Sequence, residues 1–130
     1  MPMTRILVVD DFERVRKTVR ATLQKRCDLQ VVGEASDGLE GVQKATELKP
    51  NLVLMDIGLP YLNGIEAARQ IRELVPDAKI IFLTQESADD VVEEAFNLGA
   101  RGYVIKIKAG IDLLPAIDAV ISGRQFVSGR

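Results

Sequence analysis

Residues 5–11 read Arg-Ile-Leu-Val-Val-Asp-Asp, a short apolar run that ends in two carboxylates. An apolar run of this length is typical of a strand that is buried on both faces of a sheet. Further runs of the same kind follow along the chain. The predicted strands are Arg5–Asp10, Gln30–Ala35, Asn51–Asp56, Lys79–Thr84 and Gly102–Lys106.

The stretches after these runs carry apolar residues three or four positions apart, as Val15, Val19 and Leu23 do in the first stretch. That spacing places one apolar stripe along a helix. The corresponding positions in the later stretches are Leu39, Val42, Ala45 and Leu48; Ile65, Ala68, Ile71 and Val75; Val91, Ala95 and Leu98; and Leu114, Ile117 and Val120 or Ile121. Because strands alternate with helices, the predicted fold class is α/β: a doubly wound, five-stranded parallel sheet with five helices.

Local signals add detail to this prediction. Gln30 and Glu34 make the second strand more polar than the others, which predicts an edge position. Gly99 follows the fourth helix, where a left-handed residue ends a helix well. Asp112 is predicted to cap the fifth helix, which would leave Pro115 in the first turn, where a missing N–H costs little.

The composition predicts a single globular domain over residues 1–130, with 47% apolar residues, 28% charged residues and a formal net charge of −2. A near-neutral charge without a basic run argues against direct nucleic-acid binding. The apolar runs are far shorter than the ~20 residues of a membrane helix, so we expect no membrane span. The single cysteine, Cys27, fits a reducing, cytoplasmic location. The absence of histidine excludes Ser-His-Asp triads and histidine-based zinc sites.

Polar residues end four of the predicted strands: Asp10 and Asp11 the first, Asp56 the third, Thr84 the fourth and Lys106 the fifth. The carboxyl ends of parallel strands meet at one edge of the sheet, where ligands bind in open α/β folds. We therefore expect three carboxylates, a hydroxyl and an ammonium to converge on one pocket.

Such a pocket has a defined chemistry. Neighbouring carboxylates repel one another and favour a hard cation, and Mg²⁺ suits an oxygen-rich site. A cation, Lys106 and Thr84 together would neutralise a phosphoryl group, and a carboxylate can be its acceptor. Taken singly, each Asp is better explained as a turn or helix cap, Lys106 as a solvated lysine and Thr84 as an ordinary strand residue. Their coincidence at one rim favours phosphoryl chemistry.

The chain resembles the receiver domains of two-component response regulators from about Arg5 to Val127. The motifs that carry this resemblance are Ile6-Leu7-Val8-Val9-Asp10-Asp11, Leu54-Met55-Asp56-Ile57-Gly58-Leu59-Pro60, Asn63-Gly64, Leu83-Thr84 and Gly102-Tyr103-Val104-Ile105-Lys106. The chain is most similar to the subfamily whose receivers precede a LuxR-type helix-turn-helix domain. The stretches Val31–Ala35 and Gly123–Ser128 indicate that subfamily. The implied fold is flavodoxin-like, with strand order 2-1-3-4-5.

The resemblance implies a role for each site residue. Asp56 would be the phosphoacceptor, and a sensor histidine kinase or a phosphotransfer protein would be the donor. Asp11, Asp56 and the backbone carbonyl of Gly58 would bind Mg²⁺ directly, and Asp10 would help through water. The domain would therefore be a regulatory phosphoacceptor rather than an enzyme, catalysing only its own phosphorylation and dephosphorylation.

The switch residues follow in the same way. Thr84 would bind a phosphoryl oxygen and Lys106 would pair with another. Tyr103, which by its place in a strand has packing as its default explanation, would turn inward as Thr84 moves. The surface of the fourth helix, fifth strand and fifth helix would then change, control an effector and allow a homodimer to form. We expect a core of about 5–122, with 123–130 beginning a linker to a DNA-binding effector outside this chain.

The chain departs from the family pattern in two places. Gln85 and Glu86 follow Thr84, where a small residue is common, so we expect restricted access to Asp56 and added negative charge. Ile107 stands where a proline often follows the lysine, which argues against a cis peptide there.

Three alternatives compete with the phosphorylated receiver. The first is a receiver that acts as a fixed interaction module, against which the complete set of acidic residues argues. The second is a Mg²⁺ aspartyl-phosphate phosphohydrolase, which usually needs an Asp where Gly58 stands. The third is a flavodoxin-like electron carrier, which would need a Ser/Thr/Gly-rich loop in place of residues 11–14.

Overall fold

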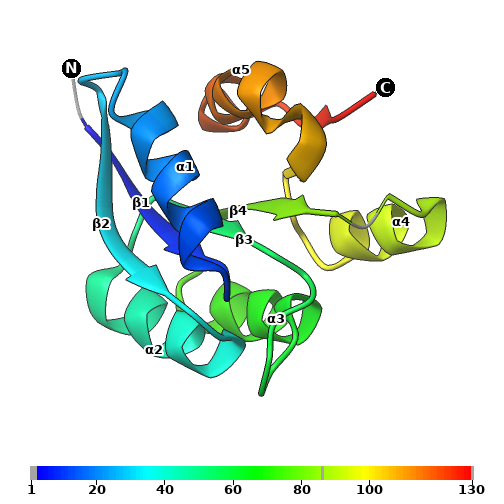
Figure 1. The fold of residues 1–130 in the computed structure, drawn as a ribbon. Coiled ribbons are helices and arrows are strands. Elements are labelled where there is room, and N and C mark those ends of the chain that lie inside the picture. Colours follow the sequence, from blue (N-terminus) through cyan, green and yellow to red (C-terminus); the bar gives the residue numbers. More distant parts are fainter. Residues whose placement is uncertain (1–2, 86, 130) are drawn as a thin grey trace.

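A computed structural model describes residues 3–85 and 87–129 and shows a parallel sheet between two layers of helices (Figure 1). The sheet has six strands in the order β2-β1-β3-β4-β5-β6. The order of the first five strands is the one predicted, and the sixth was not predicted. The strands are β1 (Thr4–Val9), β2 (Leu29–Ala35), β3 (Leu52–Met55), β4 (Lys79–Thr84), β5 (Gly102–Ile105) and β6 (Phe126–Val127).

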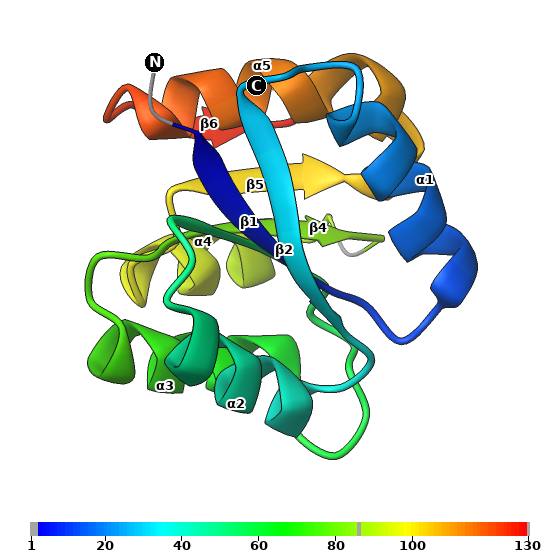
Figure 2. The ribbon, with the colours of Figure 1, turned by 90° about the vertical axis from the view of Figure 1, so that its left-hand side faces the viewer.

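Helices cover both faces of the sheet. They are α1 (Glu13–Leu23), α2 (Gly38–Leu48), α3 (Gly64–Leu74), α4 (Asp89–Asn97) and α5 (Ala109–Ile121), with a 3₁₀ turn, η1 (Lys106–Lys108), before α5. Helices α1 and α5 lie on one face, and α2, α3 and α4 lie on the other (Figure 2). Among residues 3–85 and 87–129, no helix has the length and apolar character that a membrane span requires.

The sheet separates two apolar cores because successive strand residues face opposite sides. In β1, Ile6 and Val8 pack towards α1 and α5, whereas Leu7 and Val9 pack towards the other layer. All four are at most 2% exposed, as a central strand requires. The predicted apolar run therefore marks a strand that serves both cores.

The polar second strand lies at one edge of the sheet, as predicted, and Gly99 has the left-handed conformation (φ +114°) expected after α4. The prediction for Leu39 is wrong, because this side chain is 57% exposed. The fully buried positions of α2 are Gly38, Gly41 and Ala45, and Val42 and Leu48 are partly buried against the same core. Gly41 allows the helix to approach Val9 of β1 closely. Of the predicted stripe, Val42, Ala45 and Leu48 pack on the core and Leu39 does not.

The predicted start of the fifth helix is also wrong. Helix α5 begins at Ala109, directly after η1, so Asp112 lies in its first turn and Pro115 lies inside the helix. Asp112 accepts a hydrogen bond from the Ser128 hydroxyl at 2.8 Å instead of capping the helix. Ser128 is buried, its N–H donates to Tyr103 O, and its hydroxyl accepts from Ile105 N–H. These bonds hold β6 against β5, so the sheet takes in part of the 123–130 segment.

Candidate functional site

The carboxyl ends of four strands bring the predicted site residues together. Asp10 and Asp11 follow β1, Asp56 follows β3, Thr84 is the last residue of β4, and Lys106 directly follows β5. Since the strands are parallel and adjacent in the order β1-β3-β4-β5, these ends share one edge of the sheet.

Three carboxylates form the acidic part of the site. Asp10, Asp11 and Asp56 each offer one oxygen, and these oxygens lie within 4.8 Å of one another. Asp10 is 2% exposed and Asp56 is 8% exposed. Asp11 Oδ1 is buried and has no hydrogen-bond partner among the described residues. A buried, unpaired carboxylate oxygen beside two further carboxylates fits a hard divalent cation such as Mg²⁺.

Lys106 balances part of this negative charge. Its Nζ lies 2.8 Å from Asp10 Oδ2 and 3.0 Å from Asp56 Oδ2. Burial lowers the pKa of Lys106, but the hydrogen bonds to Asp10 and Asp56 outweigh burial, so the pKa is raised overall. Burial raises the pKa of Asp10 above its ordinary value, although Lys106 and the Phe12 N–H oppose that shift. At Asp10, burial therefore outweighs the effect of Lys106.

The backbone around Asp56 is tightly constrained. Asp56 N–H donates to Val9 O at 3.1 Å, and Gly64 N–H donates to Ile57 O at 2.7 Å. A Cβ atom at Gly64 would lie 2.0 Å from Asp56 O, so only glycine fits at the start of α3. Asn63 caps α3 by accepting the Glu66 N–H at 2.9 Å. The Asn-Gly pair thus places α3 directly against the strand end that carries Asp56.

A shallow cleft of about 290 Å³ opens onto Asp56 and Lys106. Its lining residues are Phe12, Asp56, Ile57, Gly58, Thr84, Gln85 and Lys106. Phe12 is 59% exposed, and Lys106 Nζ lies 6.0 Å from the centre of its ring. Phe12 was not predicted from the sequence as a site residue. A large aromatic residue directly after the paired carboxylates is the signal that would have indicated it.

Of two further predicted site residues, Gly58 lines the cleft and Tyr103 lies away from it. Tyr103 does not line the cleft: its ring is 1% exposed and lies 6.3 Å from the Phe82 ring, in the core beneath α3 and α4. Gly58 N–H lies 3.4 Å from Asp56 Oδ1. The described residues contain no cis peptide bond. The predicted charge effect of Glu86 concerns a residue outside the described ones.

Sequence comparisons identify similar proteins. Residues 6–118 match the response regulator receiver domain family. The chain is 42% identical over 128 residues to the transcriptional regulatory protein LiaR of Bacillus subtilis, covering 98% of this chain and 61% of LiaR. It is 38% identical to the response regulator GacA of Pseudomonas viridiflava, covering 97% of this chain and 59% of GacA. The chain thus spans about three fifths of these relatives.

Solved structures of response regulators are also similar to this chain. A LuxR-family two-component response regulator from Aurantimonas superposes with a TM-score of 0.93 at 37% identity, covering 98% of this chain and 91% of that one. The isolated receiver domain of RcsB from Salmonella enterica, solved with the phosphomimetic BeF₃⁻, superposes with a TM-score of 0.91 at 25% identity. That match covers 98% of this chain and 94% of the RcsB domain.

Proposed function

Because the chain belongs to the response regulator receiver domain family, whose role is regulatory rather than catalytic, we propose that it accepts a phosphoryl group on Asp56 and thereby controls an effector. The observation that carries this proposal is the meeting of Asp56, two further carboxylates and Lys106 at one edge of the sheet. Of the three acids, Asp56 is the one that lines the cleft together with Thr84 and Lys106, which supports it as the proposed acceptor.

The proposed reaction is a direct phosphoryl transfer. A carboxylate oxygen of Asp56 attacks phosphorus, the bond between phosphorus and the donor's imidazole nitrogen breaks, and the imidazole leaves with that electron pair. Lys106, already 3.0 Å from Asp56 Oδ2, pairs with one phosphoryl oxygen, and the Thr84 hydroxyl binds another. Because the chain contains no histidine, a sensor histidine kinase or phosphotransfer protein supplies the phosphohistidine.

Mg²⁺ is the cofactor that we propose for this reaction. Asp11, Asp56 and the Gly58 carbonyl would bind it directly, and Asp10 would act through water. When bound, the ion supplies positive charge for the phosphoryl oxygens. The raised pKa of Asp10 and the unpaired Asp11 Oδ1 support this assignment, because both indicate negative charge that the protein alone leaves uncompensated.

The output would be a change of the surface formed by α4, β5 and α5. Thr84 and Tyr103 lie on neighbouring strands at its base, and Tyr103 is packed inward in this structure. We propose that phosphorylation shifts Thr84 and stabilises one form of this surface. The shifted surface would promote homodimer formation and control a DNA-binding effector domain, joined through a linker that begins after β6. Because response regulators are typically cytoplasmic, we propose a cytoplasmic location.

The test compares the intact mass of the wild-type protein with that of Asp56→Asn after incubation with Mg²⁺ and acetyl phosphate. A gain of ~80 Da that needs Mg²⁺ and occurs only in the wild type is the expected result. A gain in both proteins, or in neither, would reject Asp56 as the acceptor. Lys106→Ala should remain folded and lose the phosphate-dependent change in oligomeric state; an unchanged response would contradict the role of Lys106.

A further inference from the structure

The turn between β1 and α1 carries both Asp10 and Asp11, so its conformation decides where two of the three site carboxylates lie. Asp10 N–H donates to Ala35 O on β2 at 3.0 Å. Asp10 Oδ1 accepts the Phe12 N–H at 2.9 Å and closes a short local turn. Arg16 Nη1 donates to Asp10 O at 2.7 Å. A side chain of α1 thus fixes the peptide group that joins Asp10 to Asp11.

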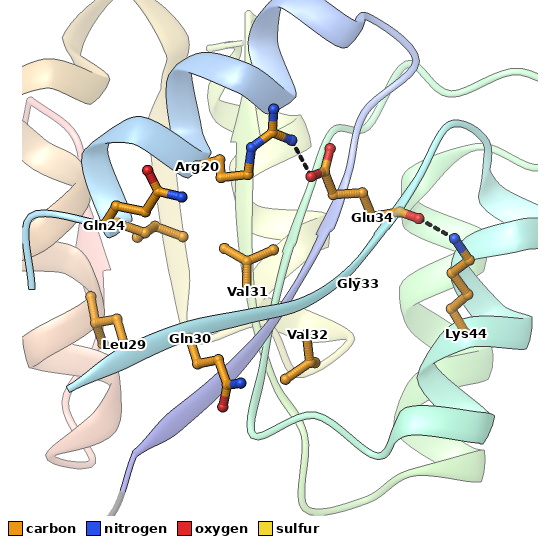
Figure 3. A pocket seen from close by; sticks show the side chains of 10 residues that line it. Arg20, Gln24, Leu29, Gln30, Val31, Val32, Gly33, Glu34 and Lys44 are labelled. Carbon is orange, nitrogen blue, oxygen red and sulfur yellow. Dashed lines mark hydrogen bonds and ion pairs between the residues drawn. The ribbon is translucent and has the colours of Figure 1, made fainter. Parts of the chain in front are cut away.

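Arg16 is itself held in place by the edge strand. Its Nε donates to Glu34 Oε1 at 3.1 Å, and its side chain is 16% exposed. Glu34 has two further partners. Arg20 pairs with its carboxylate, and Lys44 donates a hydrogen bond to its backbone carbonyl (Figure 3). The guanidinium of Arg16 therefore forms a rigid bridge from β2 to the Asp10–Asp11 peptide.

We propose that Arg16 is a positioning residue for the metal site: by fixing the Asp10 carbonyl, it places the Asp11 carboxylate for cation binding. This inference rests on the proposed function, because it assumes that the three acids hold Mg²⁺. It gives a role to a charged side chain that does not line the cleft and does not contact a site carboxylate. Partners that orient metal ligands influence metal affinity although they do not touch the metal.

Geometry and charge make opposite predictions for this residue. The positive guanidinium beside the Asp10 backbone raises the electrostatic potential at the acids and opposes a second cation. If charge alone mattered, Arg16→Gln would bind Mg²⁺ more tightly than the wild type. If positioning dominates, the same substitution weakens binding because the Asp10–Asp11 peptide loses its support. The sign of the change thus separates the two effects.

The experiment is a Mg²⁺ titration of the ¹⁵N-labelled protein, followed through the amide shifts of residues 10–12. Arg16→Gln is expected to raise the Mg²⁺ dissociation constant about tenfold. Arg16→Lys keeps the charge without the paired N–H groups, so its Mg²⁺ affinity should fall between those of the wild type and Arg16→Gln. Arg20→Gln is the matched control, since Arg20 pairs with the same Glu34 carboxylate, and its affinity should remain that of the wild type. Thermal unfolding without Mg²⁺ measures the structural effect of each substitution.

Unchanged or tighter Mg²⁺ binding by Arg16→Gln would overturn the inference. So would equal losses in Arg16→Gln and Arg20→Gln, because they would indicate only a structural role for the Glu34 ion pairs. If Arg16→Gln does not fold, Arg16→Lys carries the test, and wild-type affinity in that variant rejects the positioning role. A wild-type protein that binds no Mg²⁺ would reject the proposed function together with this inference.

Discussion

Lys106 Nζ lies 2.8 Å from Asp10 Oδ2, and this bond joins the end of β5 to the end of β1 across two intervening strands. The same nitrogen also lies 3.0 Å from Oδ2 of Asp56, which directly follows β3. A single ammonium therefore connects the three strand ends on which the proposed chemistry depends. The positive charge of Lys106 offsets part of the negative charge of the buried carboxylates. Substitutions at these residues therefore measure how much each charge contributes to stability.

Replacing Lys106 by Met should lower the free energy of unfolding by about 1.5–3 kcal/mol in buffer without Mg²⁺, because two buried carboxylates lose a charged hydrogen-bond donor. The pKa of Lys106 is raised above its ordinary value of 10.5, so the stabilisation is complete below that pH and disappears as the pH rises through the raised pKa. Urea denaturation at pH 7–11 measures it. Lys108→Met, at an exposed lysine of the same turn, should change stability by less than about 0.5 kcal/mol. Equal decreases in the free energy of unfolding of Lys106→Met and Lys108→Met would contradict the stabilising role of Lys106.

Replacing Asp10 by Asn should stabilise the protein in the absence of Mg²⁺, by about 0.5–2 kcal/mol at pH 7. The reason is that burial raises the pKa of Asp10, so its charge is a cost to the fold above that raised pKa. The amide oxygen still accepts the Phe12 N–H, and Lys106 keeps Asp56 as a partner. The new NH₂ group faces the Lys106 ammonium, also a donor, which reduces the gain. As the pH falls through the raised pKa, the wild-type carboxyl becomes neutral and the difference should shrink. A variant that is less stable at every pH would show that the Lys106 bond outweighs burial.

Replacing Gly64 by Ala should destabilise the fold by about 3 kcal/mol, because the added methyl group would lie 2.0 Å from Asp56 O. Either α3 or the strand end that carries Asp56 must move. Gly110→Ala is the matched control, since no atom lies within 4 Å of its added methyl group and Gly110 is in α5. That variant should gain roughly 0.5–1 kcal/mol. Chemical denaturation measures the free energy of unfolding of both variants. Similar changes in Gly64→Ala and Gly110→Ala would mean that the close approach of α3 to Asp56 O does not constrain position 64.

The site was predictable from the sequence because its residues occupy strand ends, and parallel strands place their carboxyl ends together whatever the separation along the chain. Asp10, Asp56 and Lys106 needed only the strand pattern and the order of the strands. Arg16 was not predictable in this way. It contributes through a bond to a backbone carbonyl, and no pattern of residue types indicates which carbonyl a helix arginine will reach.

The errors in the fold prediction have a similar origin. Ser128 and Asp112 join β6 to α5 through a side-chain hydrogen bond between segments that look like a loop and a helix cap. A strand as short as Phe126–Val127 has no periodicity to detect. The prediction for Leu39 failed because the buried positions at the start of α2 are Gly38 and Gly41, which a search for large apolar side chains overlooks. In each case the deciding contact is tertiary, and local pattern does not encode it.

Replacing Gln85 by Ala should speed the phosphorylation of Asp56 by acetyl phosphate severalfold. Gln85 directly follows Thr84, is exposed and lines the cleft together with Phe12 and Asp56, so a smaller side chain widens the route to the acceptor. The time course of the ~80 Da mass gain in saturating Mg²⁺ measures the rate. Gln43→Ala, at an exposed position of α2 outside the cleft, should react at the wild-type rate.

The result also separates access from charge neutralisation. If Gln85 only narrows the cleft, Gln85→Ala should react faster with acetyl phosphate and with the smaller phosphoramidate, with a larger gain for the bulkier donor. If Gln85 instead helps to hold the phosphoryl group, both donors should react more slowly, because a hydrogen-bond donor has been removed next to the developing charge. Equal rates for Gln85→Ala and the wild type with both donors would mean that the side chain at position 85 does not limit access to Asp56.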